Sequence, residues 1–267
     1  EENYIGLSKA FFDIEVDGSE VDGFPDQEKA QAPVNAITYV DMKAQVCYSY
    51  CLKYDTDTYK EFMADKENVY KDLKERYRAK GANYENFEFK IFEYDSEVQL
   101  LGEFMFYINE VFRPDFCMAW NLDFDFITVH NRLLNLGQEP AQYFSPSDFK
   151  YKYVYYKRDT ISNDPSEKSS IFLTSSYTTW VDQLALYANI NKGRGKLESY
   201  SLDFVGDYEV GERKDEYEGN IKTLHFTDYR TFLLYNIQDT MLASLIEEKC
   251  NHVDLIYQIA TVTSTRT

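Results

Sequence analysis

The sequence predicts an α/β domain with a mixed central sheet flanked by helices, because short β-prone stretches alternate with longer amphipathic stretches along its 267 residues. Two of these stretches, 36–40 and 45–50, flank a turn at 41–43 and therefore indicate a hairpin within the same sheet. Hydrophobic residues make up 44% of the chain and aromatic residues 17%, which is enough to bury a substantial core and argues against disorder.

The first half of the chain supplies most of the expected strands. Residues 10–16 are apolar and β-prone, yet they carry two acids. Residues 58–80 are rich in Lys, Glu and Asp and predict an exposed helical insertion. Apolar residues at helical spacing predict a helix over 97–112, and Gly137 ends another helix that begins near Asp125. The expected strands are residues 10–16, 36–40, 45–50, 87–92 and 116–120, and the expected helices are residues 58–80, 97–112 and 125–136.

The second half of the chain is less regular. Residues 138–170 are polar and irregular, with an aromatic hairpin candidate at 151–157. Residues 179–187 predict a strand followed by a helix, and a further helix opens at 201–205. A long amphipathic helix is expected over 228–249.

Several protein classes are disfavoured by what the chain lacks. No run of about 18 apolar residues is present, so we expect no membrane span, and the opening residues do not resemble a signal peptide. None of the four cysteines belongs to a C-x-x-C pair and only three histidines are present, which argues against a zinc finger. A disulfide framework is not expected in a domain of this size, so we expect reduced thiols in a cytosolic protein.

The formal net charge of −18 limits how the chain can bind nucleic acid. A broad phosphate-binding surface is not expected, because nonspecific affinity for a duplex comes mainly from Lys and Arg. Nucleic acid as a substrate is still compatible with this charge, because clustered carboxylates can hold divalent metal ions that supply the positive charge. We therefore expect weak DNA binding by this piece alone, with a larger basic partner delivering the strand.

Two acids stand two residues apart in the first expected strand. Because side chains alternate along a strand, Asp13 and Glu15 lie on one face. Burying two like charges together is costly unless something neutralises them, and a metal ion is the usual solution. The alternative is that both acids lie on the solvated face of an edge strand, and the pair alone leaves both interpretations open.

Two further patterns place acids at defined points of the expected helices. Asp125 follows a strand at the start of a helix, where an acid by itself would indicate helix capping, and Asn121 precedes it in the same loop. Tyr235 and Asp239 are four residues apart and therefore share one face of a helix. Each pattern alone is weak, because surface helices often carry such residues. The order and local structure of all three patterns together predict a single site.

The three patterns resemble the exonuclease motifs of the DEDD superfamily in its tyrosine subclass, and most closely those of family B DNA polymerases of the T-even phage type. The motifs are residues 12–15, 121–125 and 235–239. The histidine subclass places its base five residues before the last acid, where this chain has Leu234. Further similar stretches are residues 24–26, 35–39, 144–146, 199–203 and 214–219. The resemblance thus covers nearly the whole chain.

This resemblance implies a ribonuclease H-like (DnaQ-like) exonuclease fold and a 3′→5′ proofreading exonuclease. Such an enzyme hydrolyses the terminal phosphodiester of single-stranded DNA and releases nucleoside 5′-monophosphates. The resemblance also implies two divalent metal ions, Mg²⁺ or Mn²⁺, because hard oxygen ligands suit them better than zinc. The implied metal ligands and catalytic acids are Asp13, Glu15, Asp125 and Asp239.

Two further catalytic residues follow from the resemblance. Tyr235 would orient the attacking water, since a phenol with a pKa near 10 is a poor general base. Lys214 would neutralise charge at the scissile phosphate. From its position alone, Lys214 would instead be an ordinary surface lysine.

The resemblance also implies a set of DNA contacts. Phe24 would stack on the terminal base, which is a sequence-tolerant interaction suited to proofreading. Asn121 and Phe124 would contact the last nucleotides. Ser201 and Leu202 match a strand-binding motif, although the sequence alone favours a helix N-cap and a core leucine for them.

Two features depart from the T-even pattern. The second motif has one residue fewer between Asn121 and the Phe-Asp pair, a spacing similar to that of the protein-primed branch of family B. The segment 157–175 is polar and longer than in the family, which leaves open whether a strand-separating hairpin is present.

The resemblance divides the chain into an exonuclease domain at residues 1–245 and, at 246–267, the start of a connection toward the polymerase palm. The expected partners are the 3′ end of single-stranded DNA and the remaining domains of the parent polymerase, with no membrane. The piece itself is expected to be a monomer and cytoplasmic, in the host cytoplasm if a phage encodes it. A catalytically inactive exonuclease-fold scaffold or binding module is the main alternative, and a stand-alone DEDD ribonuclease is a third hypothesis. The scaffold ranks lower because inactive domains usually lose acids, whereas this chain keeps all four acids and Tyr235.

Overall fold

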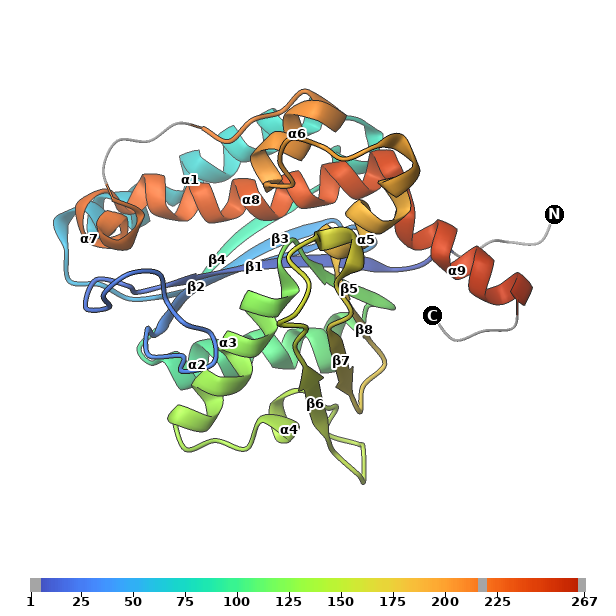
Figure 1. The fold of residues 1–267 in the computed structure, drawn as a ribbon. Coiled ribbons are helices and arrows are strands. Elements are labelled where there is room, and N and C mark those ends of the chain that lie inside the picture. The colour runs from blue at the N-terminus through green and yellow to red at the C-terminus, as the bar shows by residue number, and fades with distance from the viewer. Residues whose placement is uncertain (1–5, 216–219, 264–267) are drawn as a thin grey trace.

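A computed structural model of the chain describes residues 6–215 and 220–263. Its centre is a six-stranded sheet with helices on both faces (Figure 1), which confirms the predicted α/β class with a mixed sheet. The strands are β1 (Lys9–Val16), β2 (Val34–Asp41), β3 (Val46–Leu52), β4 (Glu88–Tyr94), β5 (Phe116–Ala119) and β8 (Thr179–Asp182). Their spatial order is β4-β3-β2-β1-β5-β8.

The sheet combines both kinds of strand pairing. β1–β2 and β2–β3 are antiparallel and include the expected hairpin, whereas β3–β4, β1–β5 and β5–β8 are parallel. Parallel neighbours require crossover connections, and these connections carry the helices over the two faces of the sheet. β1 is paired with β2 along nearly its whole length and with β5 over Lys9–Phe11, so the strand that carries the acids is not an edge strand.

A different set of helices covers each face of the sheet (Figure 1). α8 (Tyr229–Cys250) lies along β1 and β2, and α1 (Asp57–Arg78) and α6 (Leu202–Val210) pack beside it. The opposite face carries α2 (Glu97–Phe106), α3 (Leu122–Asn135) and α4 (Pro140–Tyr143). The remaining α-helices of the described residues are α5 (Gln183–Ile190), α7 (Leu224–Thr227) and α9 (His252–Thr263), and a π-helix at Tyr107–Phe112 continues α2.

Side-chain alternation along β1 divides its residues between two hydrophobic cores. Phe11 packs in the core that contains Leu233 and Ile237 of α8, whereas Phe12 packs in the core beneath α2 and α3. Each such buried side chain stabilises the fold by roughly 1.5–3 kcal/mol. Because Asp13 is two residues after Phe11, it lies on the α8 face of the sheet.

The helix expected to begin at Asp125 begins three residues earlier, at Leu122. Asn121 occupies the N-cap position, and its carbonyl accepts the main-chain N–H groups of Phe124 and Asp125. Asp125 therefore lies in the first turn of α3 and is not the capping residue. Its side chain is available for a different role.

The aromatic segment at 151–157 does not form a hairpin within itself. Its strand β6 (Val154–Lys157) pairs with β7 (Ile171–Thr174), and the polar insertion supplies both the connecting loop and the second strand. All four cysteines are free, as expected. Among the described residues, no helix has the length and apolar character needed to cross a bilayer.

Candidate active site

Asp13 and Glu15 extend from the last part of β1 toward α8. Both side chains are half-buried. Their backbone is fixed by the antiparallel ladder, in which Asp13 faces Thr38 and Glu15 faces Ala36 of β2. The predicted common face of this strand is therefore present, and it is an interior face of the domain.

Asp125 approaches β1 from the neighbouring strand–helix turn. β5 pairs with β1 only as far as Phe11, so the edge of β1 beyond that residue is not covered by β5. There the carboxylate of Asp125, which is 3% exposed, accepts the main-chain N–H of Ile14 at 3.3 Å. Since Ile14 lies between the two acids of β1, this contact places the third acid next to them.

Tyr235 and Asp239 lie one turn apart on α8, and Lys214 connects them. The ammonium group of Lys214 donates to the Tyr235 hydroxyl at 3.1 Å and to the Asp239 carboxylate at 2.5 Å. It also lies 4.7 Å from the centre of the Tyr235 ring. Lys214 is therefore part of the site and is not the ordinary surface lysine that its position alone suggested.

Two polar residues that the sequence did not single out fix the segment around Lys214. Gln238 donates to the carbonyl of Arg213 and accepts the main-chain N–H of Asp215, each at 2.9 Å. Asp203, in the first turn of α6, accepts the main-chain N–H of Lys214 at 2.8 Å. The only hint in the sequence was that Gln238 is a polar residue in a mostly apolar helix.

Asn236 was also missed by the sequence interpretation, and it ties α8 to β1. Its side chain is fully buried. Its amide donates to the Asp13 carboxylate at 2.7 Å and to the Asp13 carbonyl at 3.2 Å. The position of Asn236, next to Tyr235 in the same helical turn, could have suggested a role, but its partner lies 223 residues away in the chain.

Burial disfavours negative charge at all four acids, and repulsion by another acid of the set adds to this effect at Asp13, Glu15 and Asp125. Burial, reinforced by Asp239, raises the pKa of Asp13 to about 7. Burial also raises the pKa of Asp239 to about 6, although Lys214 opposes the shift. The pKa values of Glu15 and Asp125 are raised well above their usual range by burial and then by Asp13. The pKa of Glu15 responds to charge on Asp13, Asp239 and Asp125, so these carboxyl groups lie within electrostatic range of one another, whereas the repulsion at Asp239 itself comes from Asp203.

Lys214 is held in its charged form within this region. Burial alone would lower its pKa, but the carboxylate of Asp239 and the hydroxyl of Tyr235 outweigh that effect and raise it. One lysine is close to four acids, so full ionisation of these acids would leave the site with an excess of negative charge that a cation could neutralise. One carboxylate oxygen of Asp239 is buried without a hydrogen-bond partner.

This donor set fits divalent cations chemically, since it consists of carboxylate oxygens with an unpaired buried atom. The side chains are nevertheless not preset for an ion: within the described residues, no three His, Cys, Asp or Glu side chains are arranged to hold a metal. Lys214 takes the place of a cation at Asp239. A metal ion that uses both carboxylate oxygens of Asp239 would displace this lysine.

A cavity of about 230 Å³ opens beside Glu15 and Tyr235. Phe24 and Phe124 form its aromatic wall, with their ring centres 5.5 Å apart. Phe24 is 80% exposed, which is unusual for a phenylalanine. The structure therefore brings two of the predicted DNA contacts together next to the acids.

The other three predicted DNA contacts do not line this cavity. Asn121 is exposed at the N-cap of α3, where its side chain makes no capping hydrogen bond. Ser201 caps α6 by accepting the main-chain N–H of Phe204 at 3.3 Å, and Leu202 is buried in the core. Both residues of α6 thus have the structural roles that the sequence alone favoured.

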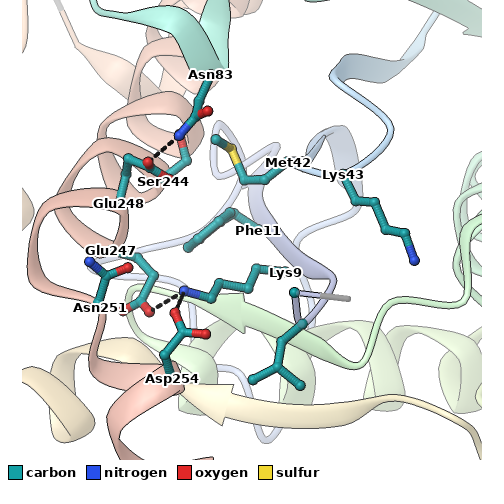
Figure 2. Close-up of a pocket in the computed structure, with 12 residues that line it drawn as sticks. Lys9, Phe11, Met42, Lys43, Asn83, Ser244, Glu247, Glu248, Asn251 and Asp254 are labelled. Atoms are coloured by element: carbon teal, nitrogen blue, oxygen red, sulfur yellow. Dashed lines mark hydrogen bonds and ion pairs between the residues drawn. The ribbon is translucent and has the colours of Figure 1, made fainter. Parts of the chain in front are cut away.

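A larger cavity, of about 450 Å³, lies at the opposite end of β1 and contains none of the predicted site residues. Lys9 crosses it and contacts Glu247 at the end of α8 and Asp254 of α9 (Figure 2). The distance from Lys9 to Glu247 is 3.1 Å. These contacts tie β1 to both helices, and we assign this cavity a structural role.

The sheet order and the flanking helices are those of a ribonuclease H-like exonuclease domain. The chain belongs to the family described as the exonuclease domain of family B DNA polymerases, which matches residues 6–205. It is therefore a 3′→5′ exonuclease domain, and the predicted family, fold and enzyme class are confirmed. Exonuclease domains of this family use divalent metal ions.

Two phage proteins are similar to the chain over nearly its whole length. The DNA-directed DNA polymerase of Escherichia phage RB69 is 26% identical over 253 residues, covering 92% of this chain and 26% of that protein. The DNA-directed DNA polymerase of Enterobacteria phage T4 is 27% identical over 257 residues, which cover 93% of this chain and 26% of that protein. The chain thus spans about a quarter of the length of the curated relatives it matches.

Proposed function

We propose that this domain proofreads DNA by hydrolysing the last phosphodiester at the 3′ end of a single strand, releasing nucleoside 5′-monophosphates. One observation carries the proposal: acids from β1, α3 and α8 face a common region directly beside an aromatic-lined cavity. The acids would act at the scissile phosphate, and the cavity would receive the terminal base.

Two divalent ions, Mg²⁺ or Mn²⁺, would be held by Asp13, Glu15, Asp125 and Asp239. When bound, such ions lower the pKa of a water and stabilise charge on the attacking and leaving oxygens. The support is that four carboxyl groups share the charge of a single lysine and that one buried oxygen of Asp239 has no hydrogen-bond partner. The ion pair between Lys214 and Asp239 would have to open as the site is filled.

Tyr235 and Lys214 would assist hydrolysis in two different ways. The Tyr235 hydroxyl, which Lys214 already contacts, would position the attacking water by hydrogen bonding. Once released from Asp239, Lys214 would balance charge on the phosphate. Phe24 and Phe124 would stack on the terminal base, which any base can satisfy.

The remaining proposed DNA contacts lie outside the cavity. Asn121 is exposed and would reach the nucleotides next to the terminus. Because Ser201 caps α6 and Leu202 is buried, we propose that these two residues contact the strand through main-chain atoms.

We also propose that the chain is one part of a larger polymerase, with the exonuclease domain at 1–245 and the connection toward the palm at 246–267. α8 continues through residue 246 to Cys250, and Asn251 in a left-handed conformation separates it from α9. The other polymerase domains would deliver the strand, since a chain with a net charge of −18 attracts DNA poorly. As a separate piece we expect a monomer, located in the host cytoplasm if phage-encoded.

End-labelled single-stranded DNA provides the direct test. With Mg²⁺ or Mn²⁺, the domain should release mononucleotides from the 3′ end. The double variant Asp13→Ala, Glu15→Ala should lose several orders of magnitude in rate. A matched control removes two exposed acids at β4 and its loop, Glu88→Ala and Asp95→Ala, and should act like the parent protein. A folded parent protein that releases no mononucleotide contradicts the proposal.

The placement of Lys214 on Asp239 is also compatible with an inactive scaffold, and calorimetry separates the two functions. An active site should bind two Mn²⁺ ions per chain, and the double variant should bind none at this site. A parent protein that binds no Mn²⁺ would instead support the scaffold. Equal rates on matched RNA and DNA strands would support the third hypothesis, a ribonuclease.

A further inference from the structure

The loop between β1 and β2, residues 17–33, carries Phe24 and is held at its base by α3. Arg132 donates to the carbonyl of Ala30 at 2.9 Å and pairs with the buried carboxylate of Glu97. Glu97 in turn accepts the main-chain N–H of Val34, the first residue of β2, at 2.8 Å. These contacts fix the part of the loop that returns to the sheet, but they lie several residues away from Phe24.

The tip of the same loop is held by one side chain from a distant part of the sequence. The ammonium group of Lys222 donates to the carbonyl of Val21 at 2.8 Å and to the carbonyl of Gly23. Gly23, directly before Phe24, has a φ of +74°, which favours glycine in this turn. The aliphatic part of Lys222 packs against Gly18, where an added Cβ would lie 3.4 Å from its Cγ.

Lys222 also belongs to the wall of the cavity beside Glu15. Of the described residues that line this cavity, it alone carries a positive charge. Two of its three N–H donors are used by the loop carbonyls. Its main structural effect is therefore on the turn that presents Phe24.

The exposed ring of Phe24 makes this turn important for binding. The ring is 80% exposed and contacts Phe124. A side chain with so few neighbours gains little orientation from packing, so its direction depends on the backbone that carries it. Fixing that backbone before the ligand arrives removes an ordering cost from binding.

We propose that Lys222 is a positioning residue that holds the Phe24 turn in place and so preforms the aromatic wall for the terminal base of a single DNA strand. This inference rests on the proposed function, because it assigns the cavity to that base. Lys222 acts through Phe24, and its removal should weaken binding of the strand end more than it slows hydrolysis of bound DNA.

The first part of the test needs no DNA. Lys222→Met keeps the aliphatic stem and removes the donors, whereas Lys29→Met removes the same charge from an exposed lysine of the same loop. Amide hydrogen exchange of residues 17–25 should become faster in Lys222→Met and stay unchanged in Lys29→Met. Equal exchange in both variants would overturn the anchoring role, whether or not the domain is a nuclease.

The second part measures binding in EDTA, where hydrolysis is not required. An oligonucleotide with 2-aminopurine at its 3′ end reports stacking through fluorescence quenching. Lys222→Met should raise the Kd about tenfold, which is within the range of one lost base–aromatic stack. Lys222→Arg should restore most of the affinity, because Arg can donate to the same two carbonyls.

A double variant shows whether the effect passes through Phe24. In a Phe24→Ala background, Lys222→Met should change the Kd by less than about twofold, because the positioned ring is already absent. A full tenfold loss in that background would overturn the proposal and assign Lys222 a direct contact with DNA. The parent protein could also fail to quench the 2-aminopurine fluorescence while the amides of residues 17–25 still exchange faster in Lys222→Met. In that case the proposed function is wrong, but Lys222 still anchors the turn.

Discussion

At the scale of single residues, Asp13 illustrates the chemistry of the site. It lies on a central strand, accepts a hydrogen bond from Asn236, and faces Asp239 and Glu15. Burial raises its pKa to about 7, so the anion is disfavoured in the absence of a cation. The sequence predicted that Asp13 and Glu15 share a face, because alternation depends only on local geometry. It could not predict Asn236 as a partner, because that contact depends on how α8 packs on β1.

Asp13→Asn should make the metal-free protein more stable at pH 8. The pKa of Asp13 is raised from 3.8 to about 7 in the folded state. Ionisation of Asp13 therefore lowers the free energy of unfolding as the pH rises from about 4 to about 7. The gain should be on the order of 1 kcal/mol once partial exposure and coupling to its neighbours are discounted. Urea unfolding in EDTA at pH 8 and at pH 4 measures it, and the difference between the proteins should nearly vanish at pH 4. A variant that is less stable at pH 8 contradicts this account of the site.

At the scale of elements, α8 connects the two halves of the site. Its apolar side packs on the sheet, while Asn236 reaches Asp13 of β1 and both Gln238 and Asp239 reach the segment 213–215. The sequence predicted this helix and the strands well, because hydrophobic periodicity is a local property. The start of α3 was missed by three residues, because the turn at Asn121 satisfies its first N–H groups without a side-chain cap. The partner of β6 was missed because strand pairing across a loop is not local.

Asn236→Ala should slow hydrolysis at least tenfold with little change in the KM for DNA. The variant frees the Asp13 side chain from α8, and loss of a hydrogen bond to a charged group costs about 1.5–3 kcal/mol. Single-turnover rates at saturating Mn²⁺ measure the effect. Thr240→Ala is the matched control, since the Thr240 hydroxyl donates to the carbonyl of Asn236 within the same helix. Equal rates for the two variants would contradict a positioning role for Asn236.

At the scale of the whole molecule, one end of β1 has a proposed catalytic role and the other end has a structural role. The end with Asp13 and Glu15 forms the proposed active site, and the end with Lys9 ties the sheet to α8 and α9. The sequence identified the first end through its acid pattern, which resembles known motifs. It gave no indication of the second, because a lone lysine at the start of a strand has no distinctive pattern.

Lys9→Met should lower stability without changing the activity of folded molecules. Glu247 is 2% exposed at its side chain, so removal of Lys9 leaves a buried carboxylate without its cation, at a cost of about 3 kcal/mol. Chemical denaturation measures this loss, and the nuclease rate per folded chain should match the parent. Lys43→Met, at an exposed lysine that lines the same cavity, should change stability by less than about 0.5 kcal/mol. Similar losses in both variants would contradict the assigned structural role.

The claim that four acids form one metal-binding site is tested most directly by the anomalous diffraction of crystals grown with Mn²⁺. We expect two manganese peaks between the carboxylates of Asp13, Glu15, Asp125 and Asp239, with Lys214 moved away from Asp239. Manganese elsewhere in the molecule, or any of these four carboxylates turned away from both ions, would contradict the account.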